Sequence, residues 1–153
     1  MDADRLIAWD EELRSAHTRL RAALSATRVA LDVGDTAPDA ASELLLFCIG
    51  FCSALDGHHR SEDRSLFPAL RDEHPELSGV IDKLMQDHSM LSHLLNALRN
   101  AVERDEDTAS IERHLDGIGA IMESHFRFEE REILAPLRAL RLEKTVPEVL
   151  GPL

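Results

Sequence analysis

The fold is decided by residues 42–70, SELLLFCIGFCSALDGHHRSEDRSLFPAL. An α-helix turns by about 100° per residue, so residues three and four apart share one face. One such face combines apolar side chains with His58 and Glu62. Its members are Leu44, Phe47, Phe51, Leu55, His58, Glu62 and Leu66. A buried Glu or His is costly unless it is paired, hydrogen-bonded or bound to a metal. The segment therefore predicts a helix that carries a polar site on its buried side.

The same HxxxE spacing recurs near the C-terminus, where His125 and Glu129 lie on a second apolar face. Two further predicted helices each carry one histidine on the apolar face, His17 and His88. A single histidine on such a face is commonly a hydrogen-bonded core residue. One on each of four helices, together with two glutamates, is difficult to explain by packing. The pattern predicts a metal site inside a helical bundle.

The composition indicates a single helical domain without a surface for polyanions. The 153 residues carry a net charge of −12 at a pI near 5.0, which disfavours binding to nucleic acid or anionic lipid. No segment reaches the length of a membrane span, and no signal-peptide pattern is present. Two cysteines, Cys48 and Cys52, do not make a disulfide framework, so the expected compartment is the cytoplasm.

Hydrophobic periodicity predicts four long helices, over about residues 4–31, 42–70, 76–103 and 108–136. Four long helices joined by short polar connections favour an all-α, up-down-up-down four-helix bundle. Its domain is expected to cover residues 1–143. The tail, residues 144–153, contains two prolines and one glycine and is expected to be irregular.

The donor types narrow the choice of metal. Imidazole and carboxylate donors suit iron, manganese or zinc, and two carboxylates can each bridge two cations. Cys48 and Cys52 lie to the side of the apolar face, so a thiolate site is not expected. Packing is their favoured role, and a redox role is the alternative. Neither the HExxH spacing of zinc proteases nor the Glu-x-x-His spacing of ferritin-like bundles occurs.

Taken together, these motifs resemble the hemerythrin-like (HHE cation-binding) domain over nearly the whole chain. The resemblance lies in His17, in HHRSE (58–62) followed by DRSLFP, in His88, and in HFRFE (125–129) followed by EREILAP. It implies two iron ions inside a four-helix bundle, bridged by Glu62 and Glu129 and by an oxo or hydroxo group. The implied terminal ligands are His17, His58, His88 and His125.

The chain departs from the oxygen-carrying hemerythrins on the third predicted helix. Those proteins have a second histidine one turn after the first, and Ser92 stands at this place, about 40° from His88. His93 is about 140° from His88 and should face outward. The pattern resembles the H-HxxxE-H-HxxxE subgroup, which has one protein ligand fewer. That difference favours an open, reactive centre over simple oxygen carriage.

Several neighbours are expected to lie outside the ligand set. His59 is about 100° from His58 and should be partly exposed at the rim of the face. Asp63 and Glu130 should be solvated or paired with arginines, and Phe128 is expected to wall the pocket. Glu132 returns to the inward face and is the first reserve ligand.

The resemblance implies chemistry on a small molecule: decomposition of hydrogen peroxide, or oxidation and detoxification of nitric oxide. Binding alternatives are oxygen or nitric oxide carriage and iron storage. A regulatory alternative is an iron or oxygen sensor whose helices become ordered when metal binds. Whether the protein is an enzyme is left open, and the sequence predicts neither the electron donor nor the oligomeric state.

Overall fold

A computed structural model describes residues 7–33 and 40–152. Within these ranges all regular structure is helical. The helices are α1 (Trp9–Val33), α2 (Ala40–Ser61), α3 (Phe67–Glu73), α4 (Ser78–Glu103), α5 (Thr108–Arg138) and α6 (Val146–Leu150). A π-helical turn, Glu62–Leu66, joins α2 to α3, and a 3-10 turn, Pro75–Leu77, precedes α4. The first linker was expected at residues 32–39, but α1 continues to Val33, and the rest of that linker lies outside the described residues, as does the expected helix start near residue 4.

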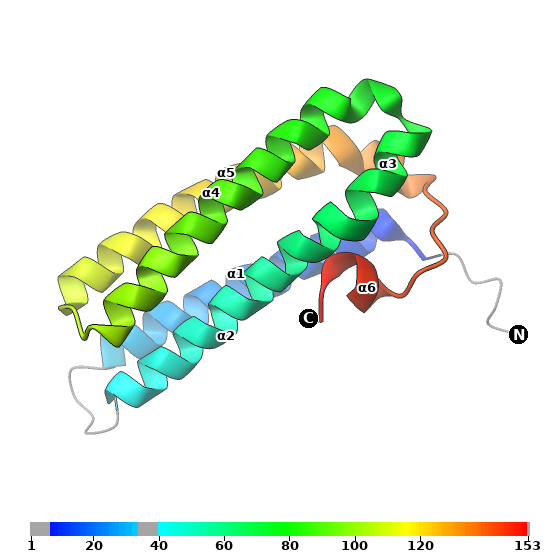
Figure 1. The fold of residues 1–153 in the computed structure, drawn as a ribbon. Coiled ribbons are helices and arrows are strands. Elements are labelled where there is room, and N and C mark those ends of the chain that lie inside the picture. The colour runs from blue at the N-terminus through cyan, green and yellow to red at the C-terminus, as the bar shows by residue number, and fades with distance from the viewer. Residues whose placement is uncertain (1–6, 34–39, 153) are drawn as a thin grey trace, which may run out of the picture.

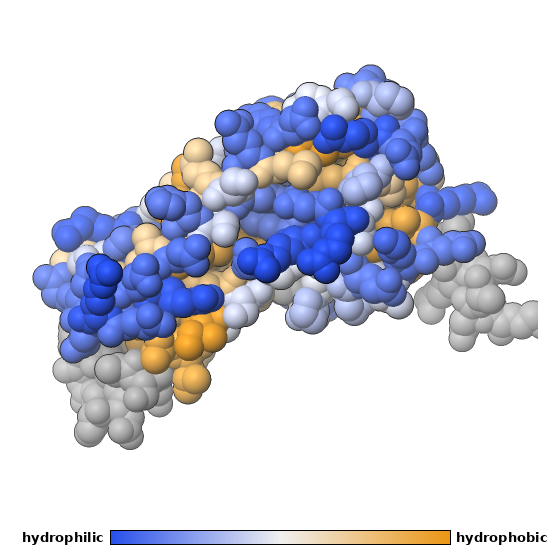
Figure 2. All heavy atoms as spheres, viewed as in Figure 1, coloured by the Kyte–Doolittle hydropathy of each residue, from blue (hydrophilic) through white to orange (hydrophobic). Residues whose placement is uncertain are grey.

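The long helices form a bundle, which confirms the all-α prediction. Each of them packs against two others: α1 on α2 and α5, and α4 on α2 and α5. Figure 1 shows the chain reversing direction between successive long helices, so their middles lie at one level. In the described ranges no helix combines the length and the apolar character needed to span a bilayer. Figure 2 shows hydrophilic side chains over most of the visible face.

The apolar core is divided into two clusters. One contains Leu20, Leu55, Leu91 and Met122, and the other contains Leu13, Leu66, Leu84 and Ile133. In each of the four helical segments, counting the π turn with α2, a buried histidine lies between the member of the first cluster and the member of the second: His17, His58, His88 and His125. The histidines therefore form a polar layer across the middle of the bundle.

The buried face of α2 is rotated from the predicted one. Phe47, predicted to face inward, is 45% exposed, whereas His59, predicted to be partly exposed, is only 3% exposed. Cys48 and Cys52 are both buried in the first cluster. When the two cysteines are counted as core residues, the centre of the face moves toward His59 and away from Phe47. The predictions for Phe47 and His59 were both wrong, because the predicted face was centred without the two cysteines.

The chain continues as a helix through Pro68 because the π turn precedes it. The backbone N–H of Phe67 donates to the carbonyl oxygen of Glu62, five residues earlier. Pro68 lies in the first turn of α3, where a missing N–H costs little. π turns of this kind are frequent at functional sites, and this one begins at Glu62.

The C-terminal tail is not wholly irregular, because residues 146–150 form α6. The hydroxyl of Thr145 accepts from the N–H of Glu148, and the Glu148 carboxylate accepts from the N–H of Thr145. This capping box starts the helix, and Pro147 lies in its first turn, where proline is tolerated. Val149 and Leu150 are buried in the second cluster, so the tail is packed on the bundle.

Candidate metal centre

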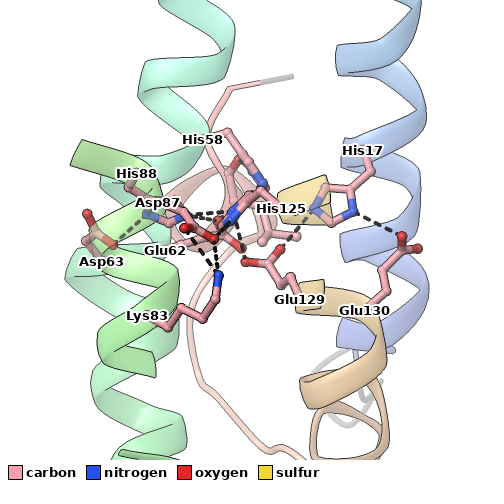
Figure 3. Close-up of polar contacts among 11 residues, drawn as sticks. His17, His58, Glu62, Asp63, Lys83, Asp87, His88, His125, Glu129 and Glu130 are labelled. Carbon is pink, nitrogen blue, oxygen red and sulfur yellow. Dashed lines mark hydrogen bonds and ion pairs between the residues drawn. The ribbon is translucent and has the colours of Figure 1, made fainter. Parts of the chain in front are cut away.

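The polar layer contains two adjacent groups of possible metal ligands, and Figure 3 labels every member of them except His59. In the first, His59, Glu62, His88 and His125 each offer one atom, and these atoms lie within 4.8 Å of one another. In the second, His17, His58 and Glu129 do the same. All seven side chains are buried. The structure thus brings together the six predicted ligands and adds His59; their role as ligands remains a prediction.

The inner ring nitrogens of the four predicted histidines point toward the two carboxylates. Nε2 of His17 donates to Oε1 of Glu129 over 2.9 Å. Nε2 of His58 and Nε2 of His88 each lie 3.4 Å from Oε1 of Glu62. Nε2 of His125 lies 3.7 Å from Oε2 of Glu129 and 3.1 Å from Nε2 of His88. Imidazole and carboxylate donors therefore converge from four helices.

The outer nitrogens of three of these histidines are held by oxygen atoms. Nδ1 of His88 donates to Asp63 over 2.8 Å, and Nδ1 of His125 donates to Asp87 over 3.0 Å. Nδ1 of His58 donates to the backbone carbonyl of Leu150 over 2.8 Å. Nδ1 of His17 has no hydrogen-bond partner among the described residues and lies 3.7 Å from Glu130. An outer partner that leaves Nε2 free inside is typical of metal-binding histidines.

Several buried polar atoms at the centre have no hydrogen-bond partner among the described residues. They are Nε2 of His58, Nε2 of His59, both carboxylate oxygens of Glu62 and Oε2 of Glu129. Leaving such an atom unpaired in a protein interior costs about 1–3 kcal/mol. A metal cation would satisfy these nitrogens and oxygens together. The residues present therefore fit a metal ion.

Burial and charged neighbours have competing effects on the pKa values of the predicted ligands. Burial raises the pKa of Glu62 to about 8. Burial acts in the same direction on Glu129, but the hydrogen bond and charge of His17 outweigh it and lower the pKa of Glu129. Against the effect of burial, carboxylate partners raise the pKa of His17 to about 9 and that of His88 to about 10. Burial and the charge of His17 lower the pKa of His58 to about 3.

Aromatic rings close the site on two sides. Phe126 stacks on His17 with ring centroids 3.8 Å apart, and Phe67 lies 5.5 Å from His88. Phe128, predicted to wall the pocket, is half-buried and lies 4.4 Å beneath the ammonium of Lys83. Phe126 walls the site instead of Phe128. It follows His125 directly and faces His17 on α1.

The expected surroundings are corrected at several positions. Asp63, expected in solvent or with an arginine, pairs with His88. Glu130 does lie near arginines, 3.8 Å from Arg21, but it also approaches His17. Glu132, the reserve ligand, pairs with Arg131 and belongs to neither ligand group. Asp87 went unnoticed in the sequence, although its position directly before His88 was a possible signal.

Neither cysteine belongs to a ligand group. Cys48 and Cys52 are free thiols among the apolar side chains of the first cluster. Burial raises the pKa of Cys48 to about 12 and also raises that of Cys52, which favours the packing role. Ser92 is half-buried, and His93 is exposed as predicted.

The comparisons with known proteins agree with this site. The family model of the hemerythrin HHE cation-binding domain matches residues 10–137, which include nearly all of the four long helices and every residue of both ligand groups. Neither the curated proteins nor the solved structures contain a match to the chain. The chain belongs to the hemerythrin HHE cation-binding domain family.

Proposed function

We propose that this metal-binding domain holds two iron ions and decomposes a small oxidant, hydrogen peroxide or nitric oxide. The bundle is taken to be of the four-helix, up-down-up-down type. His17, His58, His88 and His125 would bind the ions, and Glu62 and Glu129 would bridge them. The observation that carries the proposal is the pair of adjacent, buried ligand groups, each with its own glutamate. Two groups so close together suit two cations sharing carboxylates.

The donor set supports iron over a thiolate-bound metal. Both groups consist of imidazole and carboxylate donors, and no cysteine belongs to either among the residues described. Iron bound at this place would supply the one-electron redox chemistry that peroxide or nitric oxide decomposition needs. Zinc suits the same donors but has no redox chemistry, so the two metals predict different activities.

The chain's own part is to orient the imidazoles and limit access of water. Asp63 and Asp87 hold the Nδ1 protons of His88 and His125, which directs both Nε2 atoms inward. Phe126 covers the ring of His17. The site is therefore enclosed, and a small ligand suits it better than a large one.

Two surface pockets lie near Asp63 and Asp87, the residues that hold the outer nitrogens of His88 and His125. A pocket of about 470 Å³ has Asp63 and Phe67 in its lining. Another, of about 560 Å³, has Lys83 and Phe128 in its lining. The ammonium of Lys83 lies 3.3 Å from Asp87, so a chain of polar contacts runs from the surface to His125 (Figure 3). Through these contacts a proton at Nδ1 of His125 is linked to solvent.

Turnover by metal-exchanged protein tests the proposal. Protein reconstituted with iron and protein reconstituted with zinc are compared for disproportionation of peroxide to water and oxygen, and for oxidation of nitric oxide with dioxygen supplied as the oxidant. We expect two iron ions per chain and many turnovers per centre, with no turnover by the zinc form. Glu62→Gln removes a buried, unpaired carboxylate and should reduce bound iron. The matched control is Glu112→Gln, a change at an exposed position of α5.

Three outcomes would contradict the proposal. Iron-loaded protein that consumes only one equivalent of each oxidant per centre would be a carrier or a store. One metal ion per chain would exclude the two-ion centre. Equal iron loss in Glu62→Gln and Glu112→Gln would show that the carboxylate of Glu62 is not a ligand.

A sensor is the second candidate, favoured by the unpaired polar atoms of the core. Because Glu62 and His58 are buried without full partners, the metal-free fold is penalised and metal binding should order it. Loss of helical circular dichroism on iron removal, restored by iron, would support a sensor. A metal-free protein with the full helical signal would exclude it.

A further inference from the structure

His59 is the histidine of the polar layer that the predicted ligand set leaves out. Its side chain is 3% exposed, and its Nε2 atom has no hydrogen-bond partner among the residues described. It follows His58 directly at the end of α2, one turn before Glu62. A buried imidazole with an unpaired nitrogen is costly, so its position calls for a partner.

The ring of His59 is placed against the two histidines of the first ligand group. It lies parallel to His88, with ring centroids 3.8 Å apart and planes inclined by 10°. It meets His125 edge-on at 5.1 Å and 79°. A ligand atom of each of these rings and of Glu62 lies within 4.8 Å of the others. His59 is thus as close to a common point as the predicted ligands are.

We propose that His59 is a fifth histidine ligand, which binds the metal ion of the first group together with His88 and His125. The inference rests on the proposed two-ion centre. Among the residues described, three imidazoles then serve the first group and two, His17 and His58, serve the second. The position expected to stay open beside Ser92 is filled instead from α2.

Packing alone does not account for a histidine at this place. A ring that only had to stack on His88 would cost less as phenylalanine, because no polar nitrogen would be buried. Nε2 of His59 is buried and has no hydrogen-bond partner among the described residues, so it is available to a metal ion.

His59→Phe separates the ligand role from the packing role. Phenylalanine preserves the ring and its stacking but removes both nitrogens. The matched control is His93→Phe on α4, at an exposed position. Metal content and affinity are measured by titrating metal-free protein with cobalt(II) and recording visible absorption. We expect the control to bind two ions like the unmodified protein, and His59→Phe to bind the second ion more weakly. The loss should be at least the roughly 10- to 100-fold that removal of an outer partner costs.

Two results separate failure of this inference from failure of the proposed centre. An unmodified protein that binds a single ion would contradict the two-ion centre itself. Two ions in the unmodified protein and unchanged affinity and spectrum in His59→Phe would overturn the role of His59 alone.

A measurement on the unmodified protein covers the case in which His59→Phe does not fold. Ring nitrogen signals of ¹⁵N-labelled histidines are followed during titration with zinc. The His59 signal should shift as the first group fills, while that of His93 should not. A His59 signal that stays unchanged at two zinc ions per chain would overturn the inference.

Discussion

Nδ1 of His58 donates to the backbone carbonyl of Leu150 over 2.8 Å, across 92 residues of sequence. The C-terminal segment therefore fixes the ring of a predicted metal ligand. Gly151 follows at φ 89°, where a Cβ atom would lie 3.0 Å from both the backbone nitrogen and Cα of His58. This close approach requires glycine, both for its positive φ and for its lack of a side chain.

Gly151→Ala should weaken both folding and metal binding. The added Cβ would push the tail away from α2, and the positive φ would add strain. We expect a loss of about 1–3 kcal/mol in the free energy of unfolding. Displacing the Leu150 carbonyl should also lower metal affinity by about 10-fold or more. Chemical denaturation and metal titration measure the two effects.

Gly117→Ala is the matched control for that change. Gly117 lies within α5, and a Cβ there would meet nothing within 4 Å. Alanine at such a place should stabilise by about 0.5–1 kcal/mol and leave metal binding unchanged. If Gly151→Ala behaved like Gly117→Ala, the tail would not be supporting His58.

Asp87→Asn tests the outer partner of His125. The amide keeps the shape of the carboxylate but loses its charge, so the imidazole is held less firmly and is less basic. We expect metal affinity to fall by about 10- to 100-fold. Asp82→Asn is the control, since Asp82 is on the same helix but pairs with Arg71 at the surface. Competition with a chelator of known affinity measures the difference. Equal affinities in the two variants would assign Asp87 a surface role only.

The periodicity of the sequence was sufficient to predict the four long helices and the polar layer. His17, His88 and His125 lie where their apolar faces place them, because those faces are centred on leucines and isoleucines. The face of α2 was misjudged because cysteine was not counted as an apolar residue. Cys48, Cys52, Leu55, His59 and Glu62 follow one another at helical spacing and form a continuous buried row.

Other features depend on contacts between distant segments, which helical periodicity does not show. The pairing of Asp63 with His88 joins α4 to a π turn that no apolar pattern marks. The contact of Leu150 with His58 depends on how the tail folds back. Only the Thr-x-x-Glu spacing at Thr145 was available as a signal for α6, and the two prolines of the tail obscured it.

The metal-free protein should be most stable close to about pH 6.5. In the folded state the pKa values of His17 and His88, about 9 and 10, lie above the ordinary 6.5, and that of Glu62, about 8, lies above 4.5. The folded state then holds more protons than the unfolded chain, so stability falls as pH rises toward 9. The lowered pKa values of His58, His59 and His125 have the opposite sign and together outweigh Glu62 below pH 6.5, so stability also falls as the pH drops from 6.5.

Thermal unfolding in chelator and in excess metal, from acid to alkaline pH, checks this dependence. Metal replaces the protons on His17, His88 and Glu62, so the alkaline loss should disappear in the loaded protein. His17→Gln should flatten the alkaline slope of the metal-free protein, while the exposed control His93→Gln should not. A midpoint that rises between pH 7 and 9 in chelator would contradict the assigned pKa shifts.

The last prediction is that a histidine on α4 can replace His59 of α2 as the fifth imidazole. The double variant His59→Ala/Ser92→His tests it. Ser92 lies one turn after His88 on the same side of α4, so an imidazole there can approach the first ligand group as His59 does. Removal of the His59 ring also makes room for the larger side chain, which limits overpacking. We expect His59→Ala to lose the second metal ion and the double variant to regain it, as counted by elemental analysis. His59→Ala/Ser89→His is the control, because Ser89 is exposed on the same helix. Recovery by both double variants would mean that any added histidine suffices. Recovery by neither, in folded protein, would show that the ion does not take its fifth imidazole from this side of the bundle.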